Sequence, residues 1–275
     1  MMSSGNAQII KSYDPDNDLN KLIFNEAFIK KNNIKKINGQ KSYKKRGDMI
    51  RQSQEIEFFE FHRSGDLKQF GYTSFNTKDT IYQFFDLSDQ LIMSEGIRSR
   101  AGETVDEYEY NDIGQPVSKT KVKYYTDLEG KQFKTIISEE KITYKTLSDT
   151  SWKATNYNNY EKPYKATTFT YNKMDFLTEE KEVFLIGNRQ IITSYVYNEM
   201  GLLNEIKVNK KIPEKTLFHY NGLGDLIRLE YFKNGVLDHI HEFFYDENTA
   251  LLSSSFSREE VSGFINIVKY DFEFY

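Results

Sequence analysis

The sequence predicts an all-β fold in which antiparallel strands run up and down in chain order. Three observations predict it. Aromatic residues make up 15% of the 275 residues while the mean hydropathy is low, at -0.68, and rings suit a pleated, half-buried surface better than a helix. A motif with two aromatic residues before a tight turn recurs about every 25 residues. A second series of turn signals lies about 12 residues from the first.

The repeat is a pair of aromatic residues separated by one position and followed by Asn, Asp or His, two variable residues and Gly. Its clearest copies are Phe59–Leu67, Tyr108–Gly114, Tyr195–Leu203 and Phe218–Leu226. Weaker copies keep the frame with substitutions, at Phe85–Leu91, Phe169–Leu177 and Phe243–Leu251. The long gap between the pairs that end at Tyr110 and Tyr171 leaves room for one degenerate copy, around Tyr144.

The polar residue after the aromatic pair is typical of a turn. Asn or Asp opens a type I turn, and Gly at the fourth position adopts the left-handed backbone that returns the chain antiparallel. We therefore expect a left-handed backbone at Gly201 and Gly224. Thr249 holds this position after Asp246, and because a β-branched residue tolerates that conformation poorly, we expect Asn248 to adopt it instead.

The two series of turns set the length and number of the strands. Asn234-Gly235 is the strongest two-residue hairpin signal. The spacing leaves strands of about 8 to 10 residues and about 16 strands between residues 50 and 275. Equivalent rings recur on every second strand, about 9.6 Å apart, so we expect a ladder of rings on one face to form the core.

An open, strongly twisted sheet of this size curls into a barrel, splits into two layers or coils round itself. The sequence leaves these three outcomes open. We expect an antiparallel up-and-down meander of tandem β-hairpin repeats that forms a long twisted or curled sheet.

The first 50 residues follow a different pattern. Apolar residues at a helical period predict a short amino-terminal helix capped by Asp18, with its apolar side formed by Leu19, Leu22, Ile23, Ala27 and Ile29. An extended segment over Ile34–Ile37 follows. We expect residues 1–50 to form a helix and lead-in segment that covers an open edge or end of the sheet, and residues 51–275 to form the repeat domain.

Composition and charge exclude several classes of protein. The chain has no Cys, which removes disulfides, thiolate nucleophiles and Cys metal sites. The net charge is -4, and the chain after residue 50 is acidic and repels phosphate backbones, so we expect no nucleic-acid partner. No stretch approaches the roughly 18 apolar residues of a membrane-spanning helix. The first residues lack a signal pattern, so we expect either a cytosolic protein or one whose signal has been removed.

At Tyr197-Asn198-x-x-Gly201-x-Leu203 and its copies, the chain resembles the YD (Rhs-type) repeats, in which Tyr-Asp is followed by two variable residues, Gly and an apolar residue. Tyr231–Gly235 is similar to the bacterial MORN-type repeats. The resemblance covers residues from about 50 to the end and implies a bacterial, exported or surface-associated β-repeat protein whose repeats do no chemistry themselves. Asn replaces Asp in several copies, the usual Arg after the Gly is missing, and no toxin domain follows the repeats.

A pair of histidines offers one candidate metal site. His239 and His241 lie on one face of a predicted strand beside Glu242, with His219 on the preceding copy. They would bind a divalent metal if a neighbouring strand supplied a third ligand. Because polar residues are expected on the solvent face of an ordinary strand, we prefer that interpretation.

Other candidate sites are also better explained by structure. Asp14, Asp16 and Asp18 alternate as in a calcium loop, but Leu19 stands where that loop needs Gly, so a helix-capping turn is preferred. The acidic pairs Glu139–Glu140 and Glu259–Glu260 are ordinary strand residues, and nucleophile elbows and phosphate-binding loops are missing from the sequence. We expect no catalytic, cofactor-binding or metal-binding residues, no cofactor and no enzyme activity.

Three functions remain open. The first is a non-enzymatic scaffold, exported or at the cell surface, that mediates interaction with a protein or polysaccharide partner. The second is a binder or carrier of a glycan or apolar ligand through an aromatic groove. The third is a membrane barrel, which needs a continuous apolar band that strands rich in Lys, such as Leu203–Lys211, do not offer. The oligomeric state is left open.

Overall fold

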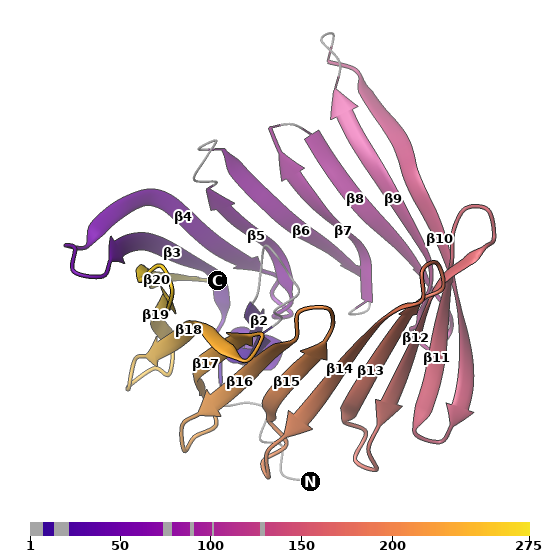
Figure 1. Ribbon diagram of the computed structural model, residues 1–275. Coiled ribbons are helices and arrows are strands. Elements are labelled where there is room, and N and C mark those ends of the chain that lie inside the picture. Colours follow the sequence, from indigo (N-terminus) through magenta and orange to yellow (C-terminus); the bar gives the residue numbers. More distant parts are fainter. Residues whose placement is uncertain (1–7, 14–21, 74–78, 89–90, 101, 127–129) are drawn as a thin grey trace.

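The computed structural model describes residues 8–13, 22–73, 79–88, 91–100, 102–126 and 130–275. Eighteen antiparallel strands, β3 to β20, form a closed barrel in which each strand pairs with its neighbours in the chain and β20 pairs with β3 (Figure 1). The prediction of an all-β antiparallel meander that stays an open twisted or curled sheet is therefore wrong in its closure. Closure removes both sheet edges, whose unpaired backbone groups would otherwise be exposed.

The barrel strands are β3 (Ile34–Lys45), β4 (Arg51–Phe61), β5 (Leu67–Thr73), β6 (Thr80–Ser88), β7 (Leu91–Ser99), β8 (Gly102–Tyr110), β9 (Pro116–Thr126), β10 (Gln132–Ser148), β11 (Ser151–Tyr157), β12 (Pro163–Tyr171), β13 (Leu177–Phe184), β14 (Arg189–Tyr197), β15 (Leu203–Asn209), β16 (Glu214–Tyr220), β17 (Leu226–Lys233), β18 (Val236–Tyr245), β19 (Leu252–Glu259) and β20 (Phe264–Phe274). The wall thus begins at Ile34, within the first 50 residues, and β3 supplies the strand that closes it.

The seam between β20 and β3 joins the two ends of the wall. Gly39 of β3 lies opposite Tyr270 of β20 and Glu57 of β4. A Cβ atom at Gly39 would come within 2.7 Å of the Glu57 side chain and 3.1 Å of the Tyr270 ring. Because Gly39 leaves this space free, the Tyr270 hydroxyl crosses β3 and donates to the Glu57 carboxylate at 3.0 Å. Lys41 pairs with the same carboxylate at 3.0 Å, so the seam has a polar cluster in addition to its backbone ladder.

The turns that follow the aromatic pairs have the predicted geometry. At Asn198 the carbonyl accepts from the Gly201 N–H at 2.9 Å, and the side-chain oxygen accepts from the N–H groups of Met200 and Leu202 at 3.0 and 2.9 Å. Gly201 has a φ of 77°. The same side-chain bonds recur in four further turns, which begin at Asn111, Asn158, Asn172 and Asn221.

Two other turns test the finer predictions. Asn234 and Gly235 have φ values of 52° and 76°, as a two-residue hairpin requires. In the turn after Asp246 the prediction of Asn248 is wrong, because Ala250 adopts the left-handed backbone, with a φ of 56°. This turn is one residue longer, and the Ala250 N–H closes it on the Asp246 carbonyl at 2.9 Å.

The predicted amino-terminal helix is also wrong in extent. Asp18 and Leu19 lie outside the described residues. Leu22–Phe24 forms strand β2, which pairs with β1 (Ile10–Tyr13), and only Glu26–Lys31 forms a helix, α1. The cap is Asn25, whose side chain accepts from the Phe28 N–H at 3.2 Å. Within the described ranges, no helix has the length and apolar character needed to cross a membrane.

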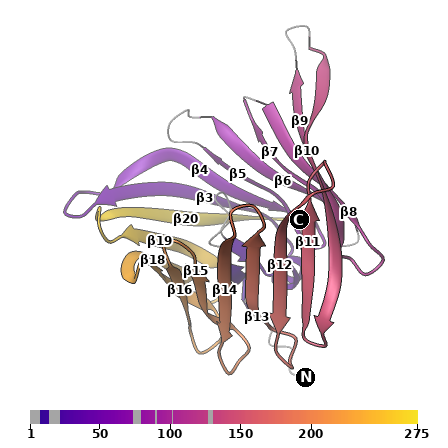
Figure 2. The same cartoon turned by 45° about the vertical axis from the view of Figure 1, so that its right-hand side comes forward.

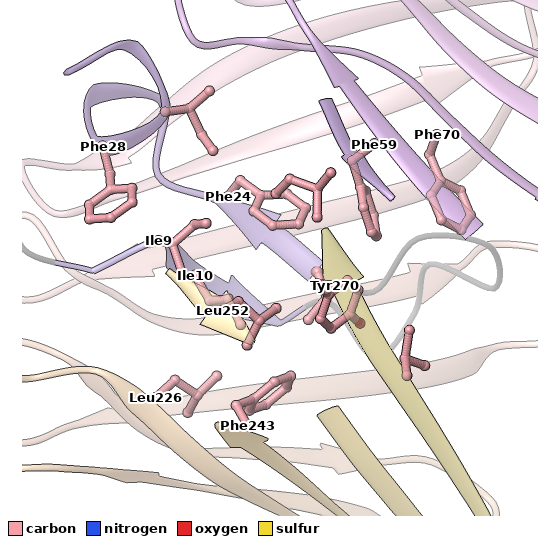
Figure 3. Packing of buried hydrophobic residues seen from close by; sticks show 14 of the residues in the cluster. Ile9, Ile10, Phe24, Phe28, Phe59, Phe70, Leu226, Phe243, Leu252 and Tyr270 are labelled. Atoms are coloured by element: carbon pink, nitrogen blue, oxygen red, sulfur yellow. The ribbon is translucent and has the colours of Figure 1, made fainter. Parts of the chain in front are cut away.

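This amino-terminal segment lies inside the barrel. Phe24 packs edge-on against Phe59 and Phe61 of β4, at ring-centroid distances of 4.7 and 5.2 Å. Figure 3 shows Phe24, Ile9 and Ile10 between β4 and β5 on one side and β17 to β20 on the other. The segment therefore bridges two opposite stretches of the wall.

The aromatic ladder is a core on one side of the lumen only. The apolar cluster joins the amino-terminal segment to β3–β5 and β14–β20, and it contains none of the described residues of β6–β13. Its fully buried members include Ile9, Ile10, Ile29, Ile34, Ile37, Phe59, Phe61, Leu226 and Leu252. Figure 2 shows β3, β4 and β18 to β20, which belong to this filled side, at the left of the barrel and β8 and β11 at the right.

We expect Gly201→Val to lower the free energy of unfolding by more than about 1 kcal/mol, because Val is disfavoured at positive φ and its Cβ would lie 3.1 Å from the Phe176 ring. The matched control is Gly187→Val. Gly187 has a φ of 82°, and a Cβ atom added there would have no other atom within 4 Å. Urea unfolding should show a loss in both variants and a larger loss at Gly201. A neutral Gly201→Val would contradict the turn geometry.

We expect Phe24→Ala to lower the free energy of unfolding by about 3–5 kcal/mol, because it leaves a cavity where the amino-terminal segment meets β4. Phe244→Ala is the matched control, since Phe244 is 50% exposed, and it should cost less than about 1 kcal/mol. Thermal or urea unfolding checks both values. Equal effects of the two substitutions would contradict a stabilising role for the segment.

Candidate functional site

The open side of the lumen has an inner face that can be followed strand by strand from the filled side. Tyr195 of β14 packs against the apolar cluster, and its hydroxyl donates to Glu180 of β13 at 3.3 Å. Glu180 lies opposite Phe169 of β12, and Phe169 lies opposite Trp152 of β11. Because residues opposite each other in a sheet point to the same face, Trp152 and Phe169 face the lumen.

A pocket with a volume of 550 Å³ lies where this inner face meets the end of the barrel that carries the turns after Asn111, Asn172, Asn198 and Asn221. We call it the rim pocket. Its lining comes from the β8–β9, β10–β11 and β12–β13 turns and the adjoining strand ends, and consists of Ile113, Gln115, Tyr144, Thr146, Ser148, Asp149, Thr150, Ser151, Trp152, Tyr171 and Asp175.

Aromatic rings form one side of the rim pocket. The Trp152 ring stacks on Phe169 at a centroid distance of 4.1 Å and meets Tyr144 at 5.4 Å and an angle of 59°. The Tyr144 hydroxyl donates to the Pro116 carbonyl at 2.7 Å, which fixes the ring. This side of the pocket is therefore preformed.

Polar side chains form the other side. Ser148 and Ser151 lie at the two ends of the β10–β11 turn with their hydroxyl oxygens 2.8 Å apart. Asp149 and Thr150, at the tip of the turn, are exposed. The rim pocket thus offers ring surfaces beside hydroxyl and carboxylate groups that remain open to a ligand.

The Tyr144 bond belongs to a series along the same end of the barrel. The second aromatic residue of a repeat donates its hydroxyl to a carbonyl at the start of a strand belonging to an earlier repeat, at 2.6–2.9 Å, in Tyr110→Ile92, Tyr144→Pro116, Tyr197→Leu177, Tyr220→Leu203 and Tyr245→Leu226. We call this series the tyrosine ladder. Tyr144 belongs to this series, but its strand continues to Ser148, so no turn follows it directly as in the other copies.

Burial perturbs the phenols of the tyrosine ladder. Burial raises the pKa of the Tyr220 hydroxyl well above its ordinary value. It also raises the pKa of Tyr110. For Tyr245, burial is again the main cause of a raised pKa, and the Asp225 carboxylate adds to it. The neutral hydroxyl is the form that donates to the carbonyl, so the ladder depends on these groups keeping their protons.

We expect the folded protein to lose stability as the pH rises above about 10, the ordinary pKa of Tyr. The folded pKa of Tyr220 is raised, so its contribution is complete below the unfolded pKa and is lost as the pH rises towards the folded one. Tyr220→Phe should lower the free energy of unfolding by about 1 kcal/mol at neutral pH. Above pH 10, the free energy of unfolding of this variant should fall less than that of wild type. Urea unfolding across this range is the measurement. The control is Tyr160→Phe, at an exposed turn. It should unfold like wild type both at neutral pH and above pH 10. Identical pH profiles in wild type and both variants would contradict the role of the ladder.

Charged groups line the rest of the open side. Asp106 of β8 lies 3.1 Å from Lys119 and 3.7 Å from Lys121 of β9. The Tyr108 hydroxyl donates to Glu95 at 2.5 Å, and burial followed by this bond raises the pKa of Tyr108. Such a charged surface is stable only beside water. The open side of the lumen is therefore a wet cavity wall.

The outer face of β15, β17 and β18 is charged as well. Arg228 pairs with Glu230 at 2.8 Å and with Glu242 at 3.5 Å, on the face opposite Leu229 of the apolar cluster. Lys207 pairs with Glu205 at 2.7 Å in the same way on β15. A barrel wall that faces lipid chains needs an apolar outer band. These ion pairs favour water outside this part of the wall.

The structure keeps His239 and His241 of β18 on one face of the wall and places Glu242 and His219 on the other. His239 and His241 face the lumen, where their rings stack on Tyr231 at 4.6 Å and Phe243 at 4.5 Å. Glu242 points to the outer face, where His219 also lies, 3.7 Å from Glu230. In the part of the chain that the structure describes, no group of three or more His, Asp or Glu residues is placed to hold a metal.

The acidic candidates do not come together either. Asp14, Asp16 and Asp18 lie outside the described residues. Glu140 faces the lumen 3.4 Å from the Asn156 amide, and its neighbour Glu139 falls on the other face by strand alternation. Glu259 accepts from the Ser262 hydroxyl at 2.7 Å in the β19–β20 turn.

Sequence reasoning missed the rim pocket. Its residues come from three turns that are up to 62 positions apart, between Ile113 and Asp175. The one available signal was Trp152, the single Trp of the chain, which lies outside the regular copies of the repeat. The structure places it beside Tyr144.

Comparisons with known proteins give no family for the chain. No family model matches it, and no curated protein matches it. The resemblance to YD and MORN-type repeats therefore stays a prediction.

Among solved structures, it is similar to a porin-like protein from Bacteroides uniformis, with a TM-score of 0.40, 12% identity and coverage of 87% of this chain and 98% of that one. A porin-like protein from Bacteroides vulgatus gives 0.33 at 8% identity, with coverage of 87% and 98%. A DUF1329 family protein from Desulfovibrio piger gives 0.25 at 6% identity, with coverage of 86% and 84%. Likenesses this distant carry no argument about function.

Proposed function

We propose that this protein is a non-enzymatic binding barrel that holds a saccharide, as a free glycan or as part of a polysaccharide, in the rim pocket. The observation that supports the proposal most is the union of the Tyr144 and Trp152 rings with the hydroxyl and carboxylate groups of the β10–β11 turn in one pocket. The expectation that the protein is exported or at the cell surface stays with this proposal as a prediction.

The chemistry of a sugar fits both sides of the rim pocket. A pyranose ring offers an apolar C–H face to aromatic side chains and hydroxyl groups to polar ones. Ser148, Thr150 and Gln115 both donate and accept hydrogen bonds, and Asp149 and Asp175 accept them. The volume of 550 Å³ lies within the range of about 300–1,000 Å³ found for small-molecule sites.

The carboxylates of the rim pocket suit binding more than catalysis. Glycoside hydrolysis needs a carboxylic acid whose pKa is raised by burial, paired with a second carboxylate. Asp149 and Asp175 are exposed turn residues. Solvent on such groups keeps them available as hydrogen-bond acceptors, which is the role the proposal gives them.

Trp152 supplies the test, because it is the single Trp of the chain and its fluorescence reports on the rim pocket alone. We expect soluble oligosaccharides from a glycan panel to shift or quench Trp152 emission in a saturable way. Asp149→Ala should weaken the binding of a hit by about tenfold, the size expected for loss of a charged hydrogen bond.

The matched control is Glu199→Ala, since Glu199 is an exposed carboxylate in the β14–β15 turn at the same end of the barrel. This variant should bind like wild type. Isothermal calorimetry with Trp152→Ala, after circular dichroism has shown that the variant folds, provides a second measurement. A panel without any saturable response would contradict the proposal. Hits that bind Asp149→Ala and Trp152→Ala as tightly as they bind wild type would also contradict it.

A further inference from the structure

Six neighbouring hairpin turns at the end of the barrel opposite the rim pocket each expose an apolar side chain. They join β11–β12, β13–β14, β15–β16, β17–β18, β19–β20 and β3–β4, which are consecutive around the closed wall. In Figure 1 they follow the lower and left edge of the barrel. We call these side chains the apolar arc: Tyr160 (75% exposed), Ile186 (81%), Ile212 (45%), Val236 (65%), Val261 (89%) and Met49 (87%).

Backbone hydrogen bonds hold neighbouring turns of the arc side by side. The Asn234 N–H donates to the Pro213 carbonyl at 2.8 Å, which ties the β17–β18 turn to the β15–β16 turn. The Arg46 N–H donates to the Gly263 carbonyl at 2.9 Å, which ties the β3–β4 turn to the β19–β20 turn across the seam. Two pairs of neighbouring turns of the arc are therefore held together by backbone bonds.

Basic residues accompany the row. The turns and the strand residues next to them carry eight cations: Lys45, Arg46, Arg51, Lys162, Arg189, Lys210, Lys211 and Lys233. They carry five carboxylates, Asp48, Glu161, Glu214, Glu259 and Glu260, of which Glu260 is held by Arg258 at 2.7 Å. Apolar tips flanked by Lys and Arg are the combination that binds the interface of an anionic membrane, because the tips enter the headgroup region and the cations attract the headgroups.

The opposite end of the barrel provides an internal comparison. Its turns also expose apolar side chains, at Ile113, Met174, Met200 and Leu223. Its described turn residues, however, carry two cations, Arg63 and Lys173, against eight carboxylates: Asp66, Asp112, Asp149, Asp175, Glu199, Asp225, Asp246 and Glu247. An anionic surface would repel this end.

We propose that the apolar arc docks the barrel on the surface of a membrane that contains anionic lipid, with the arc as the only part that enters the headgroup region. The charged outer wall stays in water, and the rim pocket, at the other end of the barrel, stays open to solvent. The docking is therefore independent of what the rim pocket binds.

Flotation of the full chain with vesicles tests the proposal. We expect binding to vesicles of phosphatidylcholine mixed with phosphatidylglycerol, little binding to phosphatidylcholine alone, and weaker binding as salt screens the cations. The double variant Ile186→Asp/Val236→Asp should bind the mixed vesicles at least about tenfold more weakly. The control Met200→Asp/Leu223→Asp, at the acidic end, should bind like wild type.

Each result decides the proposal. Absence of flotation with mixed vesicles, or equal losses in the two double variants, would overturn it. Sedimentation of each protein without lipid excludes the alternative partner, a second copy of the chain: self-association that the Ile186→Asp/Val236→Asp change abolishes, with no vesicle binding, would also overturn it. Trp152→Ala should float like wild type, so failure of the glycan proposal and failure of this one are distinguishable.

Discussion

The width of the lumen is the constraint on which the rest of the structure depends. A barrel of 18 strands is too wide for the side chains of its own wall to fill. The amino-terminal segment solves this on one side, because Phe24 and its neighbours give β4, β5 and β17–β20 an apolar partner across the lumen. Without that contact the rings of Phe59, Phe218 and Phe243 would face water, and the burial that stabilises the wall would be lost.

Filling one side of the lumen has a consequence for the other. Strands β6–β13 contribute no described residue to the apolar cluster, and their inner face carries charges such as Asp106 and Lys119 that need water. The wall there holds its shape through backbone pairing, ion pairs and the tyrosine ladder. A wet, rigid inner face is where a ligand can enter without displacing the core, and the rim pocket lies on it.

Turn residues in the sequence predicted the turns of the structure. The pairing of strands that lie far apart in the chain could not be predicted from the sequence. The Asn turns follow from residues a few positions apart, and they are present. Closure depends on β3 meeting β20, and Ile34–Lys45 carries no aromatic pair that marks it as a wall strand. The helix over Leu22 failed because alternate burial of Leu22 and Phe24 against the lumen outweighs helix propensity. The rim pocket escaped because three distant turns build it.

The hydrogen bonds within the Asn turns also explain why function would concentrate at the two ends of the barrel. In each Asn turn the side-chain oxygen and the carbonyl of the Asn accept from the backbone N–H groups of the turn. The side chain of the third turn residue, such as Met200 or Leu223, is therefore not needed to close the turn. Such positions can vary without disturbing the register, whereas a strand residue that changes face would disturb the core or the outer ion pairs. Acidic turn residues gather at one end of the barrel and basic ones at the other, and under the two proposals each end meets a different environment. The fold requires only that each turn closes.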